Sequence, residues 1–249
     1  MFFPQATGGK ARSDVWTETA TMYENIYLRL EDIEAFASLL TEDEKECRLY
    51  GIPLHLSGLV YKEFSWDRHV LKDLPLGWNS FSEPPVDWTY YGAIDPHPQT
   101  PHAVLLCAVS PFGVRYYFND IFQRSGMADL ATSIFGVLGA RKLRWCKMDP
   151  LGFIEDPEEE TSMATEITDA GLYVEKATKA LQQGIIKCRS ELKQDPAIIR
   201  FSPMCRRTLW EIQRYCWDDK DNRPKDEHDP MMENVYRLEI SGMKYIDKA

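Results

Sequence analysis

The order of the apolar segments after residue 87 is the feature that most constrains how this chain can fold. Three strongly β-prone runs come first, joined by short connections, at residues 88–94, 102–110 and 114–119. Short connections favour antiparallel pairing, so these runs predict a three-stranded meander. The sequence then alternates between helical and extended segments, which predicts parallel strands joined by helical crossovers.

The alternating part begins with apolar residues at helical spacing over 127–140, and a β-prone run follows at 142–148. The same reasoning predicts, in order, a helix at 161–170, a strand at 172–175, a helix at 178–194, a strand at 198–201, a helix at 203–217 and a last helix from residue 229. This order is that of the RNase H-like α/β fold. Such a fold is a mixed sheet of a three-stranded antiparallel meander plus parallel strands, with helices on both faces.

The first 87 residues lack this alternation. Residues 31–48 show helical spacing, residues 54–71 favour short extended pieces, and residues 72–87 are rich in Pro, Gly and Ser. We therefore expect an N-terminal extension or linker region over residues 1–87 and an α/β domain over residues 88–249.

Composition limits the class of protein. No apolar run approaches the roughly 18 residues that a membrane span needs, and polar residues soon after Met1 argue against a secretory signal. The 6 cysteines include no C-x-x-C pair, so we expect buried reduced thiols in a cytoplasmic protein rather than a zinc site. The net charge of −10 argues against a surface that binds nucleic acid everywhere, but it leaves room for a local basic patch.

Three acidic residues stand where the predicted topology brings chain segments together. Asp95 ends the first strand, Asp149 ends the fourth, and Asp229 begins the last helix. The first and fourth strands are expected to be parallel neighbours, and ligands gather beyond the carboxyl ends of such strands. Clustered carboxylates are the ligands that Mg²⁺ and Mn²⁺ prefer, and two such ions about 3.5–4 Å apart catalyse phosphodiester hydrolysis.

The pattern Asp-Pro is common in this chain, and such pairs often mark turns or helix starts instead. It occurs at Asp95, Asp149, Asp156, Asp195 and Asp229. Taken singly, each is more often a cap than a ligand, and placement directly after an apolar strand is what distinguishes the candidates. Asp156 is a rival to Asp149 as the second ligand; we favour Asp149 because it directly ends its strand.

The three acids lie in short motifs, at residues 94–102 (IDPHPQTPH), 148–150 (MDP) and 229–237 (DPMMENVYR). The remaining segments of the same pattern are residues 48–51 (RLYG), 57–64 (SGLVYKEF), 177–179 (ATK) and 184–185 (GI). In combination they resemble, over most of the chain, the C-terminal nuclease region of tailed-phage large terminase subunits.

This resemblance implies a metal-dependent endonuclease that cuts concatemeric viral double-stranded DNA during genome packaging. It implies two Mg²⁺ or Mn²⁺ ions, 5′-phosphate and 3′-hydroxyl ends, the portal protein and the small terminase subunit as partners, and action in the host cell cytoplasm. The chain contains no G-x-x-x-x-G-K-[ST] phosphate loop of an ATPase motor. We therefore expect it to cut DNA but not to translocate it.

The third motif departs from the family pattern, Asp-His-x-x-Asp-Ala-x-Arg-Tyr. Pro230 replaces the usual His, and Glu233 replaces the usual second Asp. Glu233 keeps a negative charge on the same helix face as Asp229, one turn later. We therefore expect Asp229 to be the third catalytic and metal-binding acid, with Glu233 either as a further ligand or as a group that supports the ligands.

Other candidates are less specific. Asp120 follows the third strand, where the family often has an acid, although a solvated strand end is an equal alternative. For DNA contact we select Lys179, which the resemblance puts near the active site, together with Arg144 and Lys147 beside the fourth strand.

Two other functions fit the same sequence. One is another RNase H-like nuclease, of the junction resolvase type, which would prefer branched DNA. The other is a docking module for the portal or the small terminase with a degenerate site, which the acidic composition and the altered third motif favour.

Overall fold

The computed structural model describes residues 20–25, 27–38, 48–50, 58–155, 160–218, 223–225 and 229–247. The chain divides into two compact units, Met1–Lys62 with Cys216–Pro224 and Glu63–Tyr215 with Lys225–Ala249. The boundary expected after residue 87 stays a prediction.

The described part of the first unit contains the short 3-10 helix η1 (Met22–Glu24) and the α-helix α1 (Leu30–Ser38). Leu59 and Cys216 form an isolated antiparallel bridge, so the two segments of this unit are hydrogen-bonded to each other.

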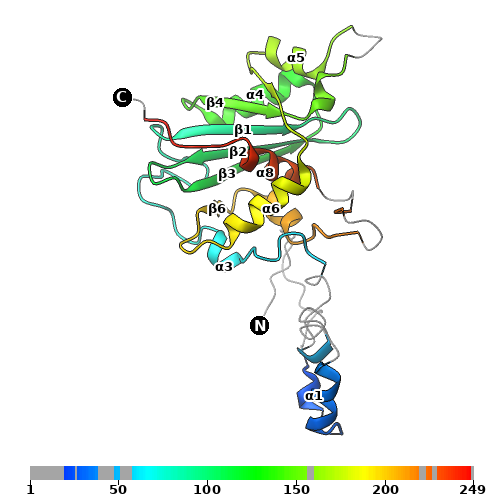
Figure 1. Cartoon of the computed structure of the whole chain (residues 1–249). Helices are drawn as coiled ribbons and strands as arrows, with labels where there is room; N and C mark the ends of the chain where they lie inside the picture. Colours follow the sequence, from blue (N-terminus) through cyan, green and yellow to red (C-terminus); the bar gives the residue numbers. More distant parts are fainter. Residues whose placement is uncertain are drawn as a thin grey trace, which may run out of the picture. The chain divides into compact units, whose positions relative to one another are not determined.

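A six-stranded mixed sheet forms the centre of the second unit (Figure 1). Its strands are β1 (Thr89–Asp95), β2 (His102–Val109), β3 (Arg115–Gln123), β4 (Leu143–Met148), β5 (Glu175–Lys176) and β6 (Ile199–Phe201). Their spatial order is β5-β4-β1-β2-β3-β6. The first three strands pair antiparallel, whereas β4, β5 and β6 each pair parallel with a neighbour. The predicted α/β architecture, a meander extended by parallel strands, is therefore confirmed.

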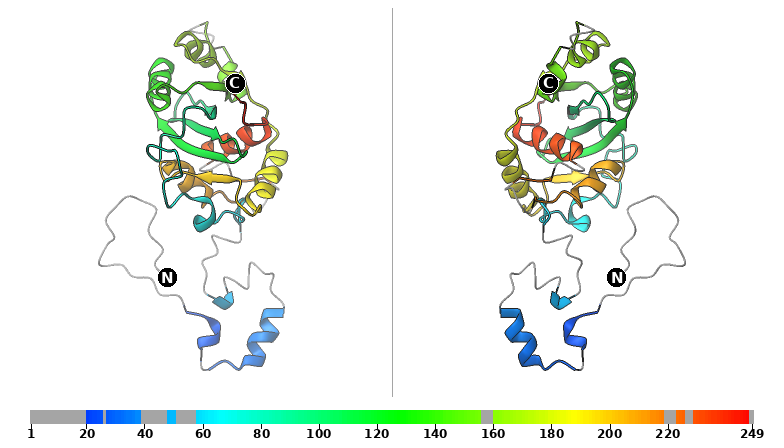
Figure 2. Two further views of the ribbon diagram at one scale, coloured as in Figure 1. Left: turned by 90° about the vertical axis from the view of Figure 1, so that its left-hand side faces the viewer. Right: turned by 90° about the vertical axis from the view of Figure 1, so that its right-hand side faces the viewer.

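Helices cover both faces of this sheet, as expected (Figure 2). They are α3 (Trp66–His69), α4 (Met127–Leu138), η3 (Pro150–Phe153), α5 (Met163–Asp169), α6 (Leu181–Leu192), α7 (Arg206–Ile212) and α8 (Pro230–Ile240). The helix α8 packs against β1, β2, α6 and α7, whereas α4 packs against β3 and α5. In Figure 2, α4 lies on the opposite side of the sheet from α6 and α8.

The prediction of short extended pieces over residues 54–71 is wrong at α3, where the chain is helical. A single helical turn forms there because the N–H of His69 donates to the Ser65 carbonyl oxygen at 2.9 Å. The ring Nδ1 of His69 in turn accepts the Ser65 N–H at 2.9 Å. A backbone bond and a bond to the His69 side chain therefore favour a helical turn over the extended structure expected from the sequence.

The alternation of β1 decides which of its residues meet which helix. Tyr90 and Ile94 belong to an apolar cluster that also contains Leu130 and Ile134 of α4. Successive side chains of a strand point to opposite faces. The odd-numbered residues of β1, with Asp95 last, therefore face α8.

Within the described residues no helix combines the length and the apolar character needed to cross a membrane. The cysteines described there are free thiols, and all but Cys216 are buried. Cys47 lies outside the described residues.

Candidate metal centre

Parallel pairing brings Asp95 and Asp149 to the same edge of the sheet. Ile94 of β1 pairs with Met148 of β4, and Asp95 and Asp149 are the residues that follow them in the sequence. The N–H of Asp149 donates to the Ile94 carbonyl oxygen at 3.0 Å, which extends the ladder by one step. The two carboxylates therefore lie side by side because the strands that precede them are in register.

A glycine allows the turns after these strands to pack closely. A Cβ atom on Gly152 of η3 would lie 2.6 Å from Met148 Sδ and 2.9 Å from Pro96 Cγ. Both distances are shorter than real Cβ contacts, so a side chain here would displace Met148 or Pro96, and glycine permits the close approach. The packing fixes the Asp-Pro turn after β1 against the one after β4.

Asp149 is held on both carboxylate oxygens. Its Oδ1 accepts the backbone N–H of Leu151 at 2.7 Å and lies 3.2 Å from Lys179 Nζ, while Oδ2 contacts Arg237. Its side chain is 5% exposed, whereas that of Lys179 is 59% exposed. Asp149 thus acts as the N-cap of η3 and faces the cluster at the same time.

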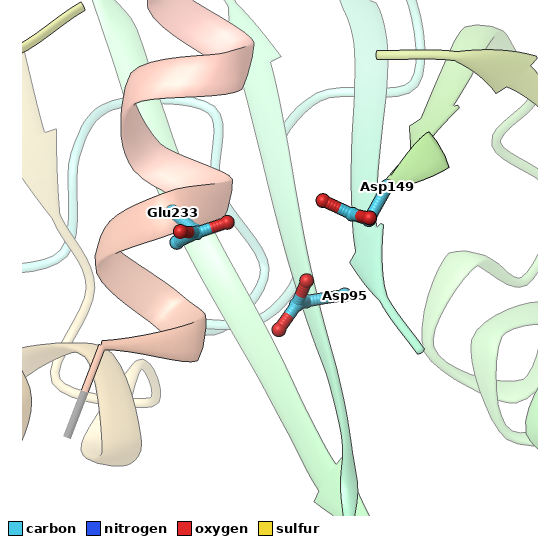
Figure 3. Close-up of side chains that lie close together, drawn as sticks. All are labelled: Asp95, Asp149 and Glu233. Carbon is cyan, nitrogen blue, oxygen red and sulfur yellow. The ribbon is translucent and has the colours of Figure 1, made fainter. Parts of the chain in front are cut away.

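Glu233, in the first turn of α8, supplies the third carboxylate. One ligand oxygen each from Asp95, Asp149 and Glu233 lie within 4.8 Å of one another. Figure 3 shows the three carboxylates directed toward a common region between α8 and the two strands. Asp229 is the N-cap residue of α8, one turn earlier, and lies outside this group of three.

The guanidinium of Arg237 stands among these carboxylates. Its Nη1 donates to Asp95 Oδ1 at 2.8 Å, and its Nη2 contacts both Asp149 Oδ2 and Glu233 Oε2. The Arg237 side chain is fully buried, and its Nε has no hydrogen-bond partner among the described residues. One cation therefore bridges all three acids.

Burial and mutual repulsion set the electrostatics of the cluster. Burial raises the pKa of Asp95 above its usual range, although Arg237 opposes this shift. Burial also raises the pKa of Glu233 to about 7, with repulsion from Asp95 and Asp229 added. For Arg237, burial disfavours the charge, but attraction to Glu233, Asp95 and Asp149 outweighs burial and raises its pKa. The cluster is thus stabilised by positive charge.

The donor set fits a divalent cation. All three side chains offer carboxylate oxygens, the hard ligands that Mg²⁺, Mn²⁺ and Ca²⁺ prefer. Within the described part of the chain, Asp95 Oδ2 and Glu233 Oε1 accept no hydrogen bond, so each retains an oxygen for a ligand. No cysteine or histidine belongs to this group, which disfavours zinc.

Contacts that the sequence did not reveal hold α8 in place. Glu211 Oε2 accepts the N–H of Met231, at the start of α8, at 2.8 Å. Its Oε1 accepts Arg207 Nε at 2.6 Å. At the far end of α8, buried Glu239 accepts the Tyr117 hydroxyl at 2.5 Å. The Arg207–Glu211 pair has the i,i+4 spacing of an ordinary helix ion pair. No motif or spacing reveals the contacts of Glu211 with Met231 or of Glu239 with Tyr117, because these partners belong to other elements.

Asp120 lies apart from the cluster. Its Oδ2 accepts the backbone N–H of Thr208 at 2.7 Å and the Thr208 hydroxyl at 2.8 Å, which ties α7 to β3. Asp156, the rival to Asp149, lies outside the described residues.

The residues selected for DNA contact differ in their surroundings. Lys179 is beside Asp149, as described above. Lys147 Nζ pairs with Glu175 Oε2 at 2.6 Å, so a structural partner already engages its charge. Arg144 is exposed but lies five residues before Asp149 along β4, about 16 Å away at the usual strand rise.

Known proteins resemble this chain in structure rather than in sequence. No family model and no curated protein matches the sequence. Among solved structures, the large terminase of one thermophilic bacteriophage matches with a TM-score of 0.58 and 19% identity, over 89% of this chain and 54% of that one. This chain therefore spans about half the length of that terminase.

Isolated nuclease domains match as well. The P22 large terminase nuclease domain has a TM-score of 0.60 and 14% identity, over 74% of this chain and 93% of that domain. The large terminase nuclease of thermophilic phage G20c has a TM-score of 0.52 and 13% identity, over 75% of this chain and 100% of that one. The resemblance read from the sequence is confirmed in the fold: this chain has the fold of large-terminase nuclease domains.

Proposed function

We propose that this chain is a divalent-metal-dependent endonuclease that cuts concatemeric viral double-stranded DNA during genome packaging. The observation that carries the proposal is the convergence of Asp95, Asp149 and Glu233 in a fold shared with large-terminase nuclease domains. The portal protein and the small terminase subunit are the partners that this function would require.

Asp95, Asp149 and Glu233 would hold the metal. When bound, Mg²⁺ or Mn²⁺, with two ions at full occupancy, would supply Lewis acidity for hydrolysing a phosphodiester bond. Asp229 is close enough to Glu233 for its charge to raise the Glu233 pKa, so it adds a further negative charge beside the site. The backbone N–H of Leu151 fixes one Asp149 oxygen and thereby orients that carboxylate.

Lys179 would bind the DNA backbone at this site. Its ammonium lies 3.2 Å from Asp149 Oδ1, yet more than half of its side chain is exposed. A cation at the edge of an acidic site attracts phosphate and lowers the repulsion between DNA and carboxylates. This local charge matters because the net charge of the chain is −10.

Nicking of supercoiled plasmid by the full chain tests the proposal. We expect nicking with Mn²⁺ or Mg²⁺, none with EDTA, and loss of nicking in Asp95→Asn and Asp149→Asn. The matched control is Asp129→Asn, an exposed aspartate on α4, which should cut like the wild type. Full nicking by a purified, folded Asp95→Asn variant would refute the proposal, and a strong preference for branched DNA would favour a resolvase.

A second candidate function is a docking module with a degenerate site. Arg237 favours it, since a guanidinium bonded to all three acids already neutralises part of their charge. A docking module should bind no Mn²⁺ in a manner that depends on Asp95. Calorimetric titration of the wild type and Asp95→Asn with Mn²⁺ therefore separates the two functions.

A further inference from the structure

We infer that Arg237 is a built-in cation of the carboxylate cluster, and that a second divalent ion enters only when its guanidinium leaves. The inference rests on the proposed metal-dependent function and concerns how many ions the site holds. With Arg237 in place the site takes one ion, and with Arg237 withdrawn it takes two.

The hydrogen bonds of the cluster limit the oxygens available. Asp149 has both oxygens engaged, Oδ1 by Leu151 and Lys179 and Oδ2 by Arg237. Asp95 and Glu233 each give one oxygen to Arg237 and retain the other. One ion can therefore bind at the two remaining oxygens while Arg237 stays, and Asp149 joins the ligands only when the guanidinium leaves its Oδ2. A second ion needs oxygens that the guanidinium occupies.

The charges of the cluster also indicate that one divalent ion binds while Arg237 stays. With Glu233 ionised, the three carboxylates carry three negative charges, and Arg237 offsets one of them. The charges of Lys179 and Asp229 beside the cluster are opposite in sign and cancel each other in this count. The remaining charge of two equals that of one divalent ion. Two ions together with a buried guanidinium would bring five positive charges to three acids, and burial strengthens the repulsion between them.

Arg237 is also placed so that it can leave. Its contact with Glu233 joins residues four apart on α8, so this contact can break by side-chain rotation without a shift of α8. Its bonds to Asp95 and Asp149 are made by the guanidinium alone. Its Nε is buried without a hydrogen-bond partner in the described part of the chain. An unsatisfied buried donor weakens the hold of the site on this side chain.

The test counts Mn²⁺ ions bound by the full chain, from the EPR signal of free Mn²⁺ during titration. The wild type should bind one ion per chain in the low-concentration phase, and Arg237→Gln should bind two, the first at least tenfold tighter. Arg237→Lys is included in case Arg237→Gln does not fold, because it keeps a positive charge in the buried site. Its single nitrogen cannot bond to all three carboxylates as the guanidinium does. It should take up the second ion at concentrations between those of the other two proteins.

The controls separate this inference from the proposed function. Equal Mn²⁺ binding by the wild type and Asp95→Asn would contradict the metal centre itself. Binding that depends on Asp95, without any gain in folded Arg237→Gln or Arg237→Lys, would contradict only the role of Arg237.

A measurement without variants covers the case in which neither Arg237 variant folds. Anomalous scattering from Mn²⁺-soaked wild-type crystals should show one ion beside an unmoved Arg237, or two ions with Arg237 turned away. Two ions with the guanidinium still bonded to all three carboxylates would overturn the inference.

Discussion

The carboxylate of Glu211 accepts the backbone N–H of Met231 at 2.8 Å and so joins α7 to the first turn of α8. The N-cap residue of α8, Asp229, makes no side-chain capping bond, so Glu211 supplies the acceptor that this helix start needs. Because Glu233 lies in the same turn, the position of the third acid depends on a residue of another helix.

We therefore expect Glu211→Gln to lower the free energy of unfolding by about 1–3 kcal/mol, since it weakens charge-assisted bonds to Arg207 and Met231 at a buried position. Urea unfolding measures this change. The control is Glu83→Gln, an exposed residue, which should change stability by less than about 0.5 kcal/mol. Equal stability of the two variants would show that Glu211 does not anchor α8.

Gly184 permits the close approach of α6 to α8. A Cβ atom there would lie 2.5 Å from Tyr236 Cδ2 and 2.7 Å from Tyr236 Cβ. Replacing glycine by alanine inside a helix ordinarily stabilises it by about 1 kcal/mol. Here overpacking should outweigh that gain, so we expect Gly184→Ala to lose about 1–3 kcal/mol in thermal or urea unfolding.

Gly136 provides the matched control for this substitution. It is also a helical glycine, on α4, and nothing lies within 4 Å of the Cβ it lacks. Gly136→Ala should therefore raise stability by up to about 1 kcal/mol. If Gly184→Ala stabilises the protein as Gly136→Ala does, the space beside Tyr236 accommodates a methyl group and α6 and α8 do not depend on glycine for their close approach.

Lys179 should affect DNA affinity more than stability. The Lys179 side chain in the ion pair with Asp149 is largely exposed, and ion pairs with an exposed member contribute little to folding stability. If it binds a phosphate, Lys179→Ala should reduce the slope of log affinity against log salt by about one. Fluorescence anisotropy with a labelled duplex over a range of KCl concentrations tests this. Lys142→Ala, at an exposed position just before β4, should keep the wild-type slope.

The positions of Asp95 and Asp149 could be predicted because they depend on a local rule. Each directly follows an apolar strand, and the order of segments makes those strands parallel neighbours. The third acid was harder to predict, because Asp229 and Glu233 share a helix face. Which of them reaches the strands depends on how far α8 is shifted along its axis, and tertiary contacts such as Glu211 to Met231 set that shift.

The role of Arg237 could not be predicted from the sequence. An arginine four residues after a glutamate ordinarily indicates an exposed pair on a helix surface. Its burial here follows from the convergence of Asp95 and Asp149, which lie 142 and 88 residues away in the chain. Only the folded sheet brings those acids together.

Because the ring of His69 is buried, we expect the protein to lose stability at acidic pH. Burial lowers its pKa below the usual value, and its two nitrogens are engaged by the Ser65 N–H and the Leu192 carbonyl oxygen, an arrangement that suits the neutral ring. The unfolded chain therefore binds the proton more readily, so stability should fall as pH drops below about 6.5, by up to about 1.4 kcal/mol per pH unit. Urea unfolding between pH 7.5 and 5.5 measures this slope, and His69→Gln should remove that part of it. An unchanged slope in His69→Gln would assign the acid sensitivity to other groups.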